Sequence, residues 1–105
     1  MEGDRKYLER MLIVLQQAKE FSESGFEDIV TKRAVERSIG IIGETAGKVS
    51  SKFRKKNPNM PWRKIEEMRS ELLHNYYLID EKILSEMVND NLPVIEKQLI
   101  AILEK

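Results

Sequence analysis

The sequence has 105 residues, and its 18 basic and 18 acidic side chains leave no formal net charge at pH 7. This length suits one domain, residues 1–105, with a modest hydrophobic core, and the balanced charge gives the whole molecule no general attraction to nucleic acid or anionic membranes. The lack of cysteine excludes disulfides, thiolate zinc sites and cysteine nucleophiles. MEGDRKYLER has no apolar signal region and MLIVL at 11–15 is too short to span a membrane, so we expect a cytoplasmic protein without membrane contacts.

The apolar spacing predicts an amphipathic helix at the start of the chain. Apolar residues recur three and four positions apart: Tyr7, Leu8, Met11, Leu12, Leu15 and Ala18. Asp4 is a candidate N-cap. The helix should end near Ser24-Gly25, because glycine readily adopts the left-handed conformation that follows many helices.

A second helix is expected to begin between Glu27 and Thr31 and to continue to about Lys55. It contains three glycines at spacings of three and four, Gly40, Gly43 and Gly47. Each should destabilise a helix by about 1 kcal/mol relative to alanine, yet together they lie on one face. Another backbone therefore comes close to this face, through packing inside the chain, a dimer contact or a ligand groove.

Prolines divide the rest of the chain. Asn57-Pro58-Asn59 and Pro61 predict a loop, followed by a helix that ends near His74. Asp80 can cap a last helix, which Pro93 should kink or divide. No segment alternates with the two-residue period of a strand. The expected fold is all-α, an antiparallel four-helix bundle with a kinked last helix.

Basic residues concentrate in the middle of the chain. No acidic residue occurs from Thr45 to Ile65, and the window contains Lys48, Lys52, Arg54, Lys55, Lys56, Arg63 and Lys64. Such a cluster attracts phosphate groups, so these seven residues are candidate RNA-binding positions. The alternative interpretation is a solvated helix end, where cations also complement the helix dipole.

The stretch RSELLHNYY contains the only histidine of the chain, five positions after Arg69 and two before Tyr76. Histidine exchanges protons near neutral pH, and arginine offers a planar fork of donors to phosphate oxygens. Arg69 and His74 are therefore candidates for RNA cleavage without a metal, and no metal site or cofactor is expected. The alternative is a packing or hydrogen-bonding role. Five helical residues rotate by about 140°, so the two side chains do not share one face, and a symmetric dimer would supply two copies of each.

Three longer stretches resemble the HepT-like group of the HEPN superfamily: IIGETAGKVS at 41–50, NPNMPWRKIEEMRSELLHNYYLID at 57–80 and NLPVIEKQL at 91–99. The resemblance covers about Tyr7 to Leu103. It implies a homodimeric four-helix bundle that acts as a metal-independent RNA-cleaving toxin, paired with a minimal nucleotidyltransferase as antitoxin. The family motif R-x4-H-x-Y falls on Arg69, His74 and Tyr76, which implies a catalytic Arg–His pair and a tyrosine that the partner can modify with AMP.

Some positions depart from the family pattern. Ser70 stands where asparagine is usual after the motif arginine, and Glu67 and Glu71 add carboxylates that would repel RNA unless they point away. Ser70 and Glu44 are candidates to support the site; Glu44 could pair with Arg69 or orient the histidine, or be an ordinary helix residue. The alternative function is a non-catalytic helical dimer that binds RNA or a nucleotide, or docks a nucleotidyltransferase. A purely structural dimer is a third interpretation.

Overall fold

The computed structural model describes residues 2–75 and 79–105 of the chain. The described part consists of helices and contains no strand. In chain order these are α1 (Glu2–Ser22), α2 (Ile29–Ala46), α3 (Ser51–Lys56), α4 (Trp62–His74), α5 (Glu81–Glu86), the π-helical turn η1 (Met87–Asn91) and α6 (Leu92–Leu103). The predicted all-α class is confirmed.

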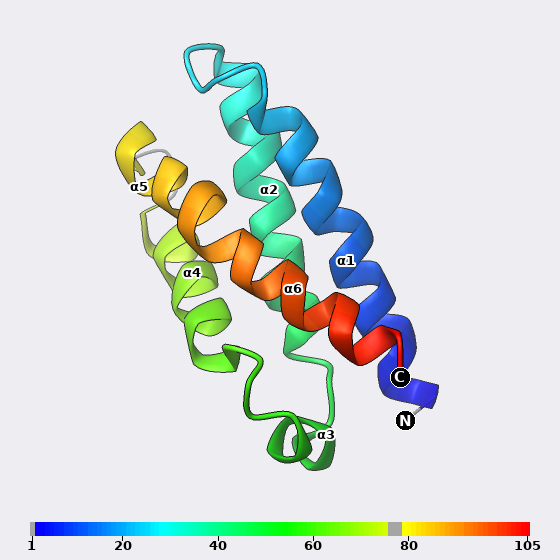
Figure 1. The fold of residues 1–105 in the computed structure, drawn as a ribbon. Coiled ribbons are helices and arrows are strands. Elements are labelled where there is room, and N and C mark those ends of the chain that lie inside the picture. Colours follow the sequence, from blue (N-terminus) through cyan, green and yellow to red (C-terminus); the bar gives the residue numbers. More distant parts are fainter. Residues whose placement is uncertain (1, 76–78) are drawn as a thin grey trace.

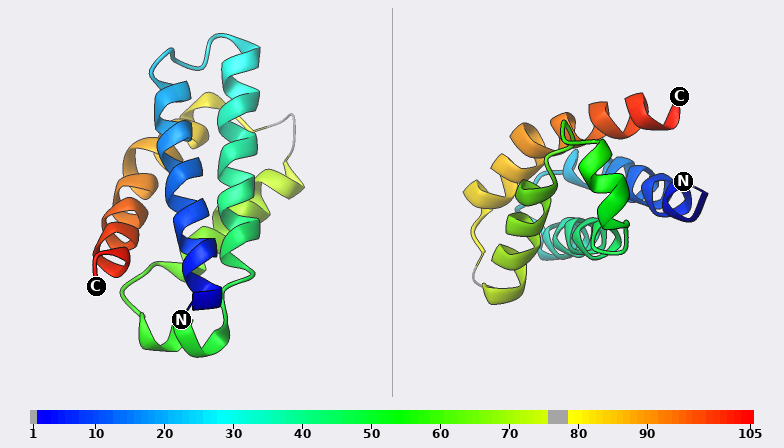
Figure 2. Two further views of the ribbon diagram at one scale, coloured as in Figure 1. Left: turned by 90° about the vertical axis from the view of Figure 1, so that its right-hand side faces the viewer. Right: turned by 90° about the horizontal axis from the view of Figure 1, so that it is seen from below.

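The long helices run in alternating directions (Figure 1). α1 and α2 lie side by side and antiparallel, and Figure 2 shows this pair from two further directions. α4 packs on α2, and α6 crosses α1. Contacts thus link α4 to α2, α2 to α1 and α1 to α6, and the short helix α3 lies at one end of the molecule.

The core lies where the apolar stripes of these helices meet. The stripe predicted for the first helix is buried as expected, with Leu8, Met11, Leu15 and Ala18 at 0% exposure. The largest of the other fully buried side chains are Ile39, Ile42, Met60, Ile65, Ile79, Leu84, Leu92, Ile95 and Leu99. Burial of each large aliphatic side chain contributes roughly 1.5–3 kcal/mol, so this core fixes how the helices pack.

Several helix ends lie where the sequence predicts them. Gly25 follows α1 with φ of 80°, a conformation that glycine adopts without steric penalty. The Asp28 carboxylate accepts a hydrogen bond from the Val30 backbone N–H at 3.0 Å, and the Asp80 carboxylate accepts one from Ile83 at 2.8 Å. Helix α4 ends at His74 as predicted. These ends are set by local hydrogen bonds, which is why sequence patterns find them.

The second helix is shorter than predicted. α2 ends at Ala46 rather than near Lys55, and α3 begins at Ser51 after an N-cap at Ser50. Asp4, predicted as the N-cap of the first helix, lies inside α1 instead. Its carboxylate accepts hydrogen bonds from the Ser50 backbone N–H at 2.8 Å and from Ser50 Oγ at 2.9 Å. These long-range bonds secure the start of α3 to α1.

The predicted irregularity beside Pro93 is a π-helical turn. η1 directly precedes Leu92, whose backbone N–H bonds to the Met87 carbonyl five residues earlier. Proline has no N–H and disturbs the helix in the turn before it, and one wide turn is a common way to absorb such a disturbance.

None of the helices among the described residues has both the length and the apolar character needed to cross a bilayer.

Candidate functional site

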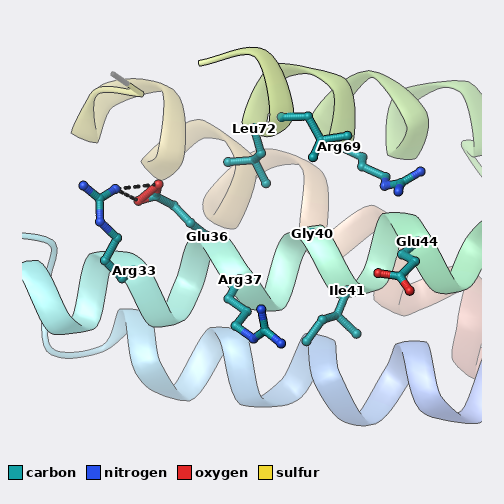
Figure 3. Close-up of a pocket in the computed structure, with 9 residues that line it drawn as sticks. Arg33, Glu36, Arg37, Gly40, Ile41, Glu44, Arg69 and Leu72 are labelled. Carbon is teal, nitrogen blue, oxygen red and sulfur yellow. Dashed lines mark hydrogen bonds and ion pairs between the residues drawn. The ribbon is translucent and has the colours of Figure 1, made fainter. Parts of the chain in front are cut away.

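A groove of about 500 Å³ runs between α2 and α4 (Figure 3). Charged residues line it together with apolar ones and one glycine. The lining residues are Arg33, Glu36, Arg37, Gly40, Ile41 and Glu44 of α2, and Arg69, Leu72 and Leu73 of α4. Among the residues proposed from the sequence, the groove contains Arg69 and Glu44.

Gly43 sets how closely α4 approaches α2. A Cβ atom at this position would lie 2.6 Å from Arg69 Cβ and 3.0 Å from Arg69 Cδ, so any side chain there would force Arg69 or α4 to shift. The glycine thus lets the aliphatic stem of Arg69 pack directly on the backbone of α2. Of the alternatives for the glycine face, packing inside the chain applies to Gly43, whereas Gly40 opens onto the groove and Gly47 caps the end of α2.

The packed stem leaves the Arg69 guanidinium in the groove. Figure 3 shows this group and the Glu44 carboxylate at the same end of the groove. In the described residues no ion pair or hydrogen bond joins them. Arg69 is therefore a half-buried cation, fixed at its base, whose donors face an open groove.

His74 lies at the last turn of α4 and is exposed. Its Nδ1 is 2.8 Å from the Ser70 carbonyl oxygen and 3.2 Å from Ser70 Oγ. A carbonyl oxygen can only accept, so Nδ1 carries the proton and donates it in this bond. In the neutral ring Nε2 is then unprotonated and can accept a proton from a substrate. Ser70 is thus in direct contact with His74, whereas Glu44 lies in the groove with Arg69.

One chain does not bring Arg69 and His74 together. Arg69 lines the groove with Leu72 and Leu73, and His74 is absent from that lining. The five-residue separation turns the two side chains about 140° apart around α4. Tyr76, the third motif residue, lies outside the described residues.

The added carboxylates Glu67 and Glu71 lie on the other side of α4 from the Arg69 groove. They line a smaller groove of about 250 Å³ between α4 and the α5–η1 segment. Glu67 also pairs with Arg63 at 3.5 Å. These carboxylates point away from the guanidinium of Arg69, but Glu67 and Glu71 share the His74 side of the helix, seven and three positions before the histidine.

The basic window divides into two kinds of residue. Lys48, Lys52, Lys55, Lys56 and Lys64 are exposed, and Arg63 is exposed beside Glu67. Arg54 differs, because it bonds to Glu66 at 2.9 Å, donates to the Ala46 carbonyl and lies 5.4 Å from the centre of the Trp62 ring. The guanidinium of Arg54 therefore has a structural role that joins α2, α3 and α4.

The exposed lysines and the histidine lie toward opposite ends of α4. The basic window ends in the first turn of this helix, and His74 is its last residue. The 13 residues of α4 span about 20 Å. Arg69 lies between the two, so an extended nucleic acid strand rather than a single nucleotide would be needed to reach all three.

Sequence patterns alone did not identify three charged residues of the groove. Nη1 of Arg33 donates to both carboxylate oxygens of Glu36, at 2.9 and 3.0 Å, and residue Glu36 is 4% exposed. Arg37 is exposed beside them. The sequence does contain one sign of the buried glutamate. Glu36 lies between Val35 and Ile39, at a position that the helical period assigns to a buried face.

An all-helical chain with Arg69 in an open groove and the exposed His74 five residues further along the same helix has side chains suited to a ribonuclease. The profile of the family described as Ribonuclease HepT-like matches residues 6–102, nearly the whole chain. The chain therefore belongs to the HepT-like ribonuclease family, and the resemblance found in the sequence is confirmed.

Individual relatives agree with this assignment. A protein from Caldanaerobacter subterraneus subsp. tengcongensis, provisionally named as an RNase, is 36% identical over 110 residues, which cover 100% of this chain and 98% of the relative. A protein from Thermococcus cleftensis, provisionally named ribonuclease HepT, is 33% identical over 94 residues, 85% of this chain and 86% of the relative. No solved structure matches the chain significantly.

Proposed function

We propose that this protein is a metal-independent endoribonuclease that acts as the toxin of a toxin–antitoxin pair. The observation that carries the proposal is the hydrogen bonding and exposure of the His74 ring in a chain of this family. The Ser70 carbonyl holds Nδ1 at 2.8 Å, and the exposed ring leaves Nε2 for proton transfer. Arg69 adds a fixed cation in an open groove.

The reaction is transesterification within RNA. Nε2 of one His74 takes the proton of a ribose 2′-hydroxyl, and the 2′-oxygen attacks the adjacent phosphorus. The bond from phosphorus to the 5′-oxygen breaks, and that oxygen takes a proton from a second, protonated His74. Arg69 stabilises the charge on the phosphoryl oxygens during the transfer. The products are a 2′,3′-cyclic phosphate and a 5′-hydroxyl.

The need for two proton-transfer groups supports a homodimer. One chain contains one histidine, and Arg69 and His74 lie on different sides of α4. A twofold axis supplies a second copy of each residue to one composite cleft. The lysines at the far end of α4 extend the binding surface along the RNA backbone.

Control by the antitoxin depends on Tyr76. We propose that a cognate minimal nucleotidyltransferase attaches AMP to this phenol in the cytoplasm. The added phosphate and nucleoside would lie two residues after His74 and would exclude RNA by both charge and volume.

The decisive experiment is RNA cleavage in EDTA by the wild type, His74→Ala and Arg69→Gln. Glutamine keeps much of the stem that packs on Gly43 but removes the cation. Arg10→Gln removes an equally charged, exposed side chain of α1 and is the matched control. Cyclic-phosphate products from the wild type and control alone would support the proposal. A folded His74→Ala variant with the wild-type rate would instead favour a non-catalytic dimer that binds RNA or docks a nucleotidyltransferase.

A further inference from the structure

Gly40 lies in the middle of α2 without a packing requirement inside the chain. A Cβ atom added there would have no atom within 4 Å, whereas one added at Gly43 would meet Arg69 Cβ at 2.6 Å. A glycine in a helix interior is destabilising by about 1 kcal/mol relative to alanine. Gly43 has an internal reason for that loss, and Gly40 has none. The open space above Gly40 belongs to the groove between α2 and α4.

Opposite charges flank Gly40 along the same face of α2. Arg37 lies one turn before it and Glu44 one turn after it, and both side chains are exposed and line the groove. Seven residues are close to two full turns, so the two charges lie about 10.5 Å apart along one side of the helix. Within residues 2–75 and 79–105, neither charge has an ion-pair partner.

This pattern is complementary to itself. The midpoint between positions 37 and 44 falls between Gly40 and Ile41. If a second α2 helix lies antiparallel across this point, related by a twofold axis, each Arg37 lies opposite Glu44 of the partner subunit. The missing Cβ of Gly40 allows the two backbones to approach closely where they cross, as small residues do at other helix crossings.

Apolar side chains border the same crossing point. Leu73 is 65% exposed although it is a leucine on a helix that packs against the core. It lines the groove together with Ile41 and the buried Leu72. A second α2 helix would remove this apolar surface from water, which favours association by about 25 cal/mol per Å² covered. The face thus combines an apolar centre with charges at its edge, as protein interfaces commonly do.

We infer that α2 of a second copy of the chain covers the Gly40–Ile41 part of this groove, antiparallel around a twofold axis at these residues, with Arg37 of each copy paired to Glu44 of the partner subunit. The inference rests on the homodimer of the proposed function and specifies its contact. It also assigns a task to Glu44, whose carboxylate lies at the Arg69 end of the groove. Once paired with the partner's Arg37, this carboxylate no longer competes with RNA phosphate for the Arg69 guanidinium.

A charge-swap series in sedimentation equilibrium tests the pairing. Arg37→Glu places the new carboxylate of each subunit opposite Glu44 of the partner subunit. Glu44→Arg places the new guanidinium of each subunit opposite Arg37 of the partner subunit. Each single variant should raise the dimer dissociation constant on the order of tenfold or more, because both symmetric contacts become repulsive. The double variant Arg37→Glu/Glu44→Arg should recover most of the wild-type affinity. Arg10→Glu on α1 makes the same charge change outside the groove and should leave the dimer unchanged.

Gly40→Leu is an independent second probe. The open space predicts that this variant folds with full helical content by circular dichroism, yet its side chain would block the close crossing and shift the protein to monomer. A wild-type dimer that both single charge variants and Gly40→Leu leave intact would overturn the assigned contact while the homodimer itself stands. Single variants that dissociate without recovery in the double variant would overturn the Arg37–Glu44 pairing. A wild-type monomer at micromolar concentration would overturn the homodimer as well.

Discussion

Arg69 packs its side-chain stem against Gly43 so closely that a Cβ at residue 43 would lie 2.6 Å from Arg69 Cβ. This contact fixes the spacing of α2 and α4 and aims the guanidinium along the groove between them. A glycine whose position in the sequence suggested only a close backbone contact thus has a particular task. It positions the arginine on which the proposed chemistry depends.

Alanine at the two glycines should therefore have opposite effects on stability. Gly43→Ala places a methyl group against Arg69 and should lower the free energy of unfolding by about 1–3 kcal/mol, as overpacking usually does. Gly40→Ala enters open space within the chain and should raise the free energy of unfolding of the monomer by up to about 1 kcal/mol through helix propensity. Urea unfolding of both variants in the Arg37→Glu background, at a protein concentration where it is monomeric, measures both effects. Equal effects of the two variants would contradict the packing difference.

Ser70 should affect cleavage much less than His74 does. His74→Ala removes the proton-transfer group and should slow cleavage by about 100- to 10,000-fold. Ser70→Ala removes Oγ but keeps the backbone carbonyl that bonds to Nδ1 at 2.8 Å, so its rate should fall by less than about tenfold. Single-turnover cleavage in EDTA compares them, with sedimentation to show that both stay dimeric. A loss in Ser70→Ala as large as in His74→Ala would show that the hydroxyl, rather than the carbonyl, holds the ring.

The exposed lysines of α3 should contribute to RNA affinity and its salt dependence. Replacing Lys52, Lys55 and Lys56 by glutamine should weaken binding and reduce the slope of log K against log salt by about 0.7 for each lost phosphate contact with a single strand. Filter binding across a salt series measures the slope. An unchanged slope would show that these lysines only solvate the end of the helix.

Arg54 should behave differently from these lysines. Its contacts with Glu66, the Ala46 carbonyl and the Trp62 ring are internal, so Arg54→Gln should lower the stability of the protein by about 1–3 kcal/mol through the lost charge-assisted bonds. Thermal unfolding of Arg54→Gln beside Lys55→Gln provides a matched pair on one helix. A stable Arg54→Gln variant with a reduced salt slope would place this arginine among the RNA contacts.

Tyr76 should be the residue that carries AMP after incubation with the cognate nucleotidyltransferase and ATP. Intact-mass and peptide mass spectrometry should show one adduct per chain, absent from Tyr76→Phe, and the modified protein should not cleave RNA. An adduct on Tyr77, or none on either tyrosine, would remove this form of control.

The attachment of α3 to α1 should weaken in acid. The backbone N–H of Ser50, and also its hydroxyl, hold the pKa of the Asp4 carboxyl below its ordinary value. The ionised form is favoured in the folded state, so its stabilising contribution is present above the ordinary pKa and is lost as the pH falls through the lower, folded-state pKa. The stability difference between wild type and Asp4→Asn should therefore shrink as the pH falls from 6 to below about 4. Asp90→Asn, at an exposed position whose side chain makes no hydrogen bond among the described residues, should show no such trend.

The sequence by itself determined the class of the fold and most helix boundaries. Asp28, Gly25 and Asp80 act on backbone groups within a few residues, and the apolar stripe of α1 follows from the helical period. The R-x4-H spacing likewise showed that Arg69 and His74 do not share a helical face. These features depend on contacts close in the chain, which a linear pattern contains.

The tertiary structure decided which side chains meet across helices. It ended α2 at Ala46 and used Asp4 to hold Ser50, 46 positions away. It gave Arg54 internal bonds to the Ala46 carbonyl and Glu66, whereas lysines that look equivalent in the sequence are exposed. It also placed Arg37 and Glu44 in one groove with Arg69. Long-range packing and the burial of apolar surface choose these contacts, because many partners of similar chemistry are available and only the folded arrangement of the helices brings particular ones within reach.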